Sequence, residues 1–410
     1  MHRQTSPAAR FGKTTIVNQR SLRLLPPMLP RDPKEAHRAA SPLELFFDLV
    51  FVVAVSFASV QLHHMAAENH LGSGVLGYLM VFFAIWWCWM NFSWFGTSFD
   101  TDDWLYRILA FIQMAGVLVL ASGAAAAMEE HDFTAITIGY AIMRLALVTQ
   151  WIRVALGNPQ LRATALRYAV GITAVQLAWF ARLLLPETAA FIGFFVLVAA
   201  EISVPIWAES RRRTPSNPHH ITERYGLFTL ILLGESILAS ANAVVESLHT
   251  IENLGALMTI AACALITAAG MWWIYFSRGH HHMITSLRSS LAYGYSHYVI
   301  FAAAGAFSAG VEVAIDQAGG HSELPAIATA GTLSVPVSLF ALGIWLLILR
   351  RELSPARNAV FLAGVAIILA GTFLPSVLPV AAVAAGIILC VASTEHRPAA
   401  GPGLAVGAAR

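Results

Sequence analysis

Six ionisable side chains of this sequence lie inside long apolar segments, where a charge is costly. They are Glu44, Asp48, Arg144, Glu201, Glu235 and His297. A charge at the centre of a lipid bilayer costs about 2.5–3.5 kcal/mol on insertion scales, so such residues usually face a protein interior and mark an ion or proton site. The alternative for each of them is a structural ion pair or a single hydrogen bond between helices.

Glu44 and Asp48 are four residues apart, which places both carboxylates on one face of a helix. Pro42 fits the first turn of that helix. Two carboxylates on one face repel each other unless they share a proton or a cation, which is the geometry of a proton relay or a cation site. The alternative is a pair that is solvated at the headgroup level or bonded to a neighbouring arginine.

Glu235 is the best single candidate, because it lies near the middle of the apolar segment 222–245. An isolated buried carboxyl group tends to stay protonated, so it can take up and release a proton. Its neighbour Gly234 predicts the close approach of another backbone, and Ser236 adds a hydroxyl group. A neutral acid that donates one hydrogen bond between helices is the alternative.

Arg144 is the arginine nearest to the middle of an apolar segment. Arginine stays charged in proteins, so it needs a carboxylate or a water-filled cavity. The candidate partners are Asp48, Glu201 and Glu235. A buried ion pair that holds the bundle together and an anion-binding role are both compatible with this position.

Glu201 precedes Pro205 by one helical turn. A proline frees a backbone carbonyl, so a carboxylate beside it can coordinate a cation, although a simple kink is the commoner outcome. His297 suits proton shuttling because histidine titrates near physiological pH, with a hydrogen-bonded core histidine as the alternative. The three adjacent histidines 280–282 cannot all face one metal from a regular helix, so we interpret them as a solvated loop. We expect neither a metal site nor a cofactor.

The composition indicates what must position these residues. The chain has 410 residues, of which 57% are hydrophobic and only 12% are charged, and its mean hydropathy is +0.66. Soluble domains have about 25% charged residues, so the apolar excess must face lipid. The chain contains only two lysines, Lys13 and Lys34, which argues against nucleic-acid binding. The three cysteines form no CxxC pair and are interpreted as buried thiols.

The apolar segments are long and do not alternate with polar residues, which predicts an all-α polytopic membrane bundle of about twelve transmembrane helices. The expected spans are 42–62, 75–97, 104–127, 133–156, 165–185, 188–207, 222–245, 254–277, 290–313, 326–349, 357–374 and 376–393. The aromatic run from Trp86 to Trp94 is interpreted as an anchor at the membrane interface, with a stacking wall for a ligand as the alternative.

The distribution of arginine predicts the topology by the positive-inside rule. The basic segment 1–40 and every second loop hold most of the arginines, whereas the opposite loops hold only Arg182 together with several acids and histidines. The loop arginines on the first side are Arg153, Arg162, Arg167, Arg211, Arg212, Arg213, Arg224, Arg278, Arg288, Arg350, Arg351 and Arg357. We therefore expect both termini of the chain to lie in the cytoplasm.

The domain organisation follows from the spans and from a weak internal repeat. At an offset of about 186 residues, the segment 86–89 (Trp-Trp-Cys-Trp) falls onto 272–275 (Trp-Trp-Ile-Tyr). This offset predicts two parallel six-helix repeats, 41–213 and 214–394, an arrangement that is common in transporters. The polar segment 1–40 lacks the apolar region of a signal peptide and is predicted to be a disordered cytoplasmic tail, and 395–410 a short cytoplasmic tail.

Two segments resemble a known family. They are 41–52 (Ser-Pro-Leu-Glu-Leu-Phe-Phe-Asp-Leu-Val-Phe-Val) and 225–236 (Tyr-Gly-Leu-Phe-Thr-Leu-Ile-Leu-Leu-Gly-Glu-Ser). Both are similar to conserved blocks of the low temperature requirement A (LtrA) family, and the resemblance covers roughly 41–393. It implies a multi-pass protein of the bacterial inner membrane, in which Glu44, Asp48, Gly234 and Glu235 match the family blocks. The family name records growth in the cold and implies no substrate.

Three classes of function are compatible with these residues. The first is a transporter or channel for protons, cations or a small solute, in which Glu235 and Asp48 bind the ion or proton and Arg144 sets their charge state. The second is a membrane-embedded enzyme that acts on a lipid or isoprenoid through Glu44 and Asp48. A sensor or scaffold without turnover is the third, and it lacks a soluble signalling domain. The expected partners are the lipid bilayer and a small ion or solute, and the oligomeric state is left open.

Overall fold

The computed structural model describes residues 25–33, 35, 38–248 and 253–395, and these residues form helices and no strands. The predicted all-α polytopic fold is thereby confirmed. In chain order the helices are α1 (Pro42–Ala67), α2 (Leu71–Phe99), α3 (Trp104–Ser122), α4 (Ala124–Glu129), α5 (Thr134–Gly157), α6 (Arg162–Arg182), α7 (Glu187–Glu209), α8 (Pro218–Ser247), α9 (Leu254–Phe276), the 3₁₀ turn η2 (His281–Met283), α10 (Leu287–Gly319), α11 (Ala326–Ile344), the π turn η3 (Trp345–Leu349), α12 (Arg350–Glu352), α13 (Pro355–Gly371) and α14 (Leu378–Thr394). Most of the predicted tails, 1–40 and 395–410, lies outside the described residues.

Each of the twelve predicted spans coincides with one helix or with a continuous pair of helices. Within the described part of the chain, nine helices are long and apolar enough to cross a membrane, counting α11 with its continuation to Glu352 as one. The other three are α6, which contains Arg162, Arg167 and Arg182, and the two C-terminal helices α13 and α14, which have only 17 residues each.

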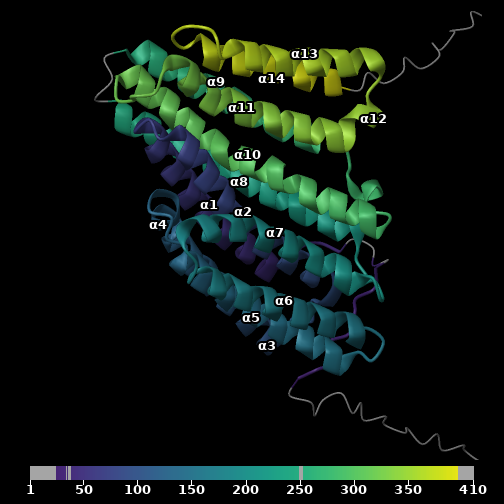
Figure 1. Cartoon of the computed structure of the whole chain (residues 1–410). Helices are drawn as coiled ribbons and strands as arrows, with labels where there is room; N and C mark the ends of the chain where they lie inside the picture. The colour runs from purple at the N-terminus through teal and green to yellow at the C-terminus, as the bar shows by residue number, and fades with distance from the viewer. Residues whose placement is uncertain (1–24, 34, 36–37, 249–252, 396–410) are drawn as a thin grey trace, which may run out of the picture.

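The helices lie side by side, so that the loops gather at two ends of the bundle (Figure 1). We call the end at which α1, α8 and α10 begin the arginine-rich end. Two hydrogen bonds tie its loops together, from Thr164 Oγ1 to the Arg212 carbonyl at 2.8 Å and from Arg278 Nη2 to the Thr394 carbonyl at 2.9 Å. The opposite end is called the far end.

Helix α1 lies at the centre of the bundle and contacts α2, α3, α8 and α10. Helices α3, α5, α6 and α7 lie on one side of this centre, and α9, α11, α13 and α14 lie on the other (Figure 1). In the first half, each helix of the series α1, α3, α5, α6 and α7 contacts the next one. In the second half, the series α8, α10, α11, α13 and α14 shows the same succession of contacts. The six-plus-six repeat stays a prediction, which this matching order supports.

Glycines bring several helix pairs into backbone contact, as is common between membrane helices. A Cβ atom at Gly116 of α3 would lie 2.8 Å from the carbonyl oxygen of Gly139 of α5. A Cβ atom at Gly310 of α10 would lie 2.9 Å from the Cα atom of Leu333 of α11. Larger residues at these positions would push the paired helices apart.

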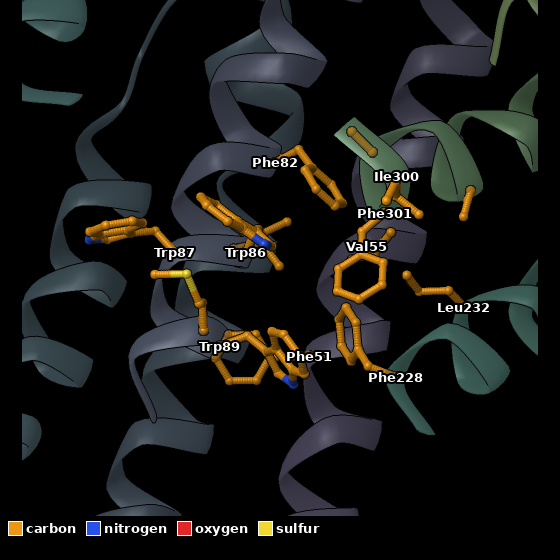
Figure 2. Close-up of a cluster of buried hydrophobic side chains, with 14 of the residues drawn as sticks. Phe51, Val55, Phe82, Trp86, Trp87, Trp89, Phe228, Leu232, Ile300 and Phe301 are labelled. Carbon is orange, nitrogen blue, oxygen red and sulfur yellow. The ribbon is translucent and has the colours of Figure 1, made fainter. Parts of the chain in front are cut away.

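An aromatic cluster joins the two halves of the bundle at the centre (Figure 2). Phe51 comes from α1, Trp89 from α2, Phe228 from α8 and Phe301 from α10. The Trp89 ring stacks on Phe228 with ring centroids 4.3 Å apart. Trp86, Trp87 and Trp89 are at most 2% exposed, so the predicted anchoring at the membrane interface is wrong for these three residues. Their rings fill the protein interior instead.

Candidate functional site

A fully buried charge cluster lies between α1 and α8, near the arginine-rich end. Arg224 donates from Nη1 to Glu44 Oε1 at 2.8 Å, and to the Asp48 carboxylate from Nη2 at 2.5 Å and Nε at 3.2 Å. All three side chains are at most 1% exposed. The assignment of Arg224 to a loop is therefore wrong. Helix α8 begins at Pro218, six residues before Arg224, so the arginine lies inside the bundle.

The start of α1 fixes the position of Glu44. Ser41 caps the helix, accepting the Glu44 N–H at 3.3 Å, while Glu44 Oε2 accepts the Ser41 N–H at 2.9 Å. This reciprocal pair is the capping box. Gly96 of α2 leaves room beside it, because a Cβ atom there would lie 2.9 Å from Glu44 Oε1 and 3.4 Å from Tyr106 Oη. The buried Tyr106 hydroxyl group has no hydrogen-bond partner among the described residues.

Trp89 and His220 complete the cluster. Trp89 Nε1 donates to Asp48 Oδ1 at 2.7 Å, and His220 Nε2 lies 3.2 Å from Glu44 Oε2. A carboxylate only accepts, so His220 Nε2 holds a hydrogen, while Nδ1 lies 2.8 Å from Thr97 Oγ1. The cluster contains the two carboxylates of Glu44 and Asp48 and the positive charge of Arg224. Its net charge is −1 when His220 is neutral and zero when His220 is protonated.

A second buried ion pair lies within the first half, between α5 and α7. Of the three predicted partners of Arg144, the structure pairs it with Glu201. The Glu201 carboxylate also accepts from Tyr140 Oη at 2.8 Å, Trp87 Nε1 at 2.9 Å and Trp179 Nε1 at 3.3 Å. Its oxygens are occupied by these donors, whereas Nε and Nη1 of Arg144 have no partner among the described residues.

Glu235 lies on the edge of the contact between α8 and α1. Its Oε1 atom accepts a hydrogen bond from Ser56 Oγ at 2.6 Å, and both side chains are partly exposed. Ser236 donates to the Ala304 carbonyl of α10 at 3.2 Å. The expected close approach at Gly234 is not found, because a Cβ atom there would meet nothing within 4 Å. Asp48, Arg144 and Glu235 thus lie in three separate places, each with its own partner.

A further cluster at the far end was not predicted. His63 of α1 lies between two carboxylates of α10, with Nδ1 3.1 Å from Glu312 Oε2 and Nε2 2.6 Å from Asp316 Oδ2. One signal of this cluster is present in the sequence, because Glu312 and Asp316 are four residues apart and share a helix face. Helix α10 continues to Gly319, beyond the predicted segment 290–313, so Asp316 lies on the same helix as Glu312.

His297 is fully buried and hydrogen-bonded on both sides. Its Nδ1 atom lies 2.7 Å from the Tyr293 carbonyl and so donates to it, and Nε2 accepts from Tyr275 Oη at 3.0 Å. His280 is also buried, with Nε2 3.0 Å from the Tyr275 carbonyl and Nδ1 3.3 Å from Tyr293 Oη. The solvated-loop interpretation is therefore wrong for His280, and burial lowers its pKa to about 4.

One face of α1 links three of these places. At 100° per residue, Glu44, Asp48, Ser56, Ser59 and His63 fall within an arc of about 120°. Their partners come from α8 and α10 of the second half, together with Trp89 of α2. On α10 the Gly305 carbonyl accepts a hydrogen bond from Ser59 Oγ at 3.0 Å. We call these five α1 residues and their partners the α1 seam. From residue 44 to residue 63 the seam spans about 28 Å, close to the roughly 30 Å of the hydrocarbon core.

An apolar layer interrupts the α1 seam between Asp48 and Ser56. It consists of Phe51 and Val55 of α1 with Phe228 and Leu232 of α8, all at most 2% exposed (Figure 2). Among the described residues, no three His, Cys, Asp or Glu side chains are placed to hold one metal ion. The α1 seam is thus a series of hydrogen-bonding groups that is interrupted by this apolar layer.

Comparison with known proteins gives two findings. Residues 39–393 match the family described as bacterial low temperature requirement A protein (LtrA). An uncharacterized protein of Rhizobium meliloti (strain 1021) is 29% identical over 252 residues, which are 58% of this chain and 59% of that protein. The match thus spans about three fifths of this relative's length. No solved structure matches the chain.

Proposed function

The chain belongs to the bacterial low temperature requirement A (LtrA) family of multi-pass membrane proteins, and we propose that it moves protons across the membrane as a proton-linked transporter. The proposal rests on the α1 seam. Its ionisable and hydroxyl groups extend over a distance close to the thickness of the hydrocarbon core. Buried ionisable residues in membrane helices mark proton and ion paths by default.

The seam contains three groups of side chains that can exchange a proton. The first is His220 with Glu44 and Asp48, and the second is the Glu235 carboxyl group beside Ser56. The third is His63 between two carboxylates, which has a net charge of −1 when the imidazole is protonated and −2 when it is neutral. In each group a change of protonation changes a contact between helices.

The apolar layer between Asp48 and Ser56 favours a gated path over an open pore, because protons cannot cross a dry layer without added water. Helix α1 belongs to the first predicted repeat, whereas α8 and α10 belong to the second. A movement of one half against the other would change the contacts of the α1 seam and hydrate the layer. Such movements of repeats are the usual mechanism of secondary transporters.

The orientation follows from the positive-inside rule. We place the arginine-rich end in the cytoplasm of a bacterium, with both termini there, and the far end with His63 on the opposite side. The alternative function, an enzyme acting on a lipid or isoprenoid, needs Glu44 and Asp48 to reach a substrate. Both carboxylates instead form buried ion pairs with Arg224. Because they do not face a space in the described part of the chain in which a substrate could bind, we prefer transport.

The test is proton flux in liposomes that contain the purified protein and an internal pH dye. We expect wild type to dissipate an imposed pH gradient faster than empty liposomes and Glu235→Gln to lose this activity. Glu246→Gln, an exposed position three turns further along α8, is the matched control and should behave as wild type. Unchanged flux in Glu235→Gln would contradict the role of the middle group of the seam.

A further inference from the structure

A cavity lies away from the α1 seam, near the arginine-rich end. Its walls come from α2, α5, α6 and α7 on one side and from the start of α10 on the other, and it has a volume of about 80 Å³. It therefore lies between the two predicted repeats. A site needs roughly 10–15 Å³ of such volume to hold one water molecule, so this cavity has room for a compact ligand of a few heavy atoms.

Aromatic rings form much of the lining of this cavity. They belong to Trp94, Phe95, Trp151, Tyr168 and Tyr295. Trp94 Nε1 donates to Tyr225 Oη at 3.1 Å, and Tyr295 Oη donates to the Ile202 carbonyl at 3.2 Å. These bonds satisfy the polar atoms of the two rings within the protein and hold the rings in place. Fixed aromatic faces attract cations.

Two polar side chains of the lining are buried. Glu209 is 8% exposed, and its carboxylate accepts from Tyr168 Oη at 3.0 Å, Thr214 N at 2.8 Å and Thr214 Oγ1 at 2.8 Å. A carboxylate has about four acceptor positions, so one is left for a ligand. Ser290 is 5% exposed, and its hydroxyl group has no hydrogen-bond partner among the described residues.

The geometry points to a binding site for a small organic cation of the size of a methylated ammonium ion. We propose that its charged centre lies among the aromatic rings beside the Glu209 carboxylate and that Ser290 Oγ bonds its polar substituent. Arg213 also lines the cavity, but it is exposed, so water screens its charge more than that of Glu209. This proposal uses no side chain of the α1 seam and is independent of proton transport.

The test is equilibrium binding of radiolabelled tetramethylammonium to the purified full chain in detergent. We expect saturable binding at one site per chain that tert-butanol, an uncharged molecule of similar size and shape, does not displace. Glu209→Gln should weaken binding about tenfold or more, and Arg213→Gln should strengthen it. Glu187→Gln at the exposed start of α7 is the matched control and should bind as wild type.

A variant that fills the cavity keeps the test informative if Glu209→Gln does not fold. Leu291→Trp changes no charge and should abolish binding, while its elution profile and melting temperature stay close to those of wild type. Absence of saturable binding in wild type would overturn the proposal. Equal displacement by tert-butanol, or unchanged binding in both variants, would overturn it as well.

Discussion

The Arg224 guanidinium of α8 binds the Asp48 carboxylate of α1 through two nitrogens, at 2.5 and 3.2 Å, although the residues are 176 positions apart. Both side chains are fully buried. The pair joins the first helix of each half of the chain. The pair is therefore both a structural link between the halves and a part of the α1 seam. Substitutions can distinguish these two roles, because stability and proton flux are measured separately.

Arg224→Gln should destabilise the protein more than Asp48→Asn. Removing the arginine leaves two buried carboxylates without a counter-charge, which we expect to cost about 3–5 kcal/mol or more. Removing Asp48 leaves the Arg224–Glu44 pair neutral, so we expect a smaller loss. Thermal unfolding of the two purified variants in the same detergent measures the difference. The opposite order of melting temperatures would contradict this charge arrangement.

The Arg144–Glu201 pair should prove structural. Glu201→Gln leaves Arg144 buried without a counter-charge, and we expect a loss of about 3–5 kcal/mol. Adding Arg144→Met removes the uncompensated charge and should recover much of this loss. A double-mutant cycle of unfolding free energies tests the coupling, and additive losses would argue against it.

Acid should destabilise the protein through His280. The pKa of this residue is about 4 in the folded chain, compared with 6.5 for an exposed histidine. Between these two pH values the unfolded chain binds more protons than the folded chain. The free energy of unfolding therefore falls as the pH drops from about 6.5 to about 4, by at most about 1.4 kcal/mol per pH unit. His280→Gln should reduce the fall in melting temperature between about pH 7.5 and about pH 5. The exposed neighbour variant His281→Gln is the control, and an identical pH dependence in wild type and His280→Gln would count against the assignment.

Phe228→Ala should make the protein leak protons. The substitution removes a ring from the apolar layer of the α1 seam and gives water a place between Asp48 and Ser56. We expect faster dissipation of a pH gradient in liposomes than with wild type. Phe361→Ala on α13 removes an equally buried ring away from the seam and should leave the flux unchanged. A decrease or no change in Phe228→Ala would contradict the role of the layer as a gate.

The fold could be predicted from the sequence because hydropathy is a local property. A run of about 20 apolar residues predicts a membrane helix without knowledge of its neighbours, and each predicted span contains a helix. The pairing of charges is not local. Arg144 had three candidate partners in the sequence, and only the packing of α5 against its neighbours brings it to Glu201.

The ends of the helices explain the other errors. Helices α8 and α10 have 30 and 33 residues and continue beyond their apolar segments. Arg224, in the second turn of α8, was assigned to a loop, because hydropathy alone cannot show that a charged residue has a partner. The buried His280 was missed for the same reason, since its hydrogen bonds come from Tyr275 and Tyr293.

The most direct test of proton movement along the α1 seam compares two buried carboxylates in one flux measurement. Asp48 belongs to the seam, whereas Glu201 is equally buried but lies outside it. Proton flux into dye-loaded liposomes is measured for Asp48→Asn and Glu201→Gln and normalised to the amount of folded protein. We predict that Asp48→Asn falls to the level of empty liposomes and that Glu201→Gln retains the wild-type flux. Equal flux in the two variants, whether retained or lost, would contradict a path along the α1 seam.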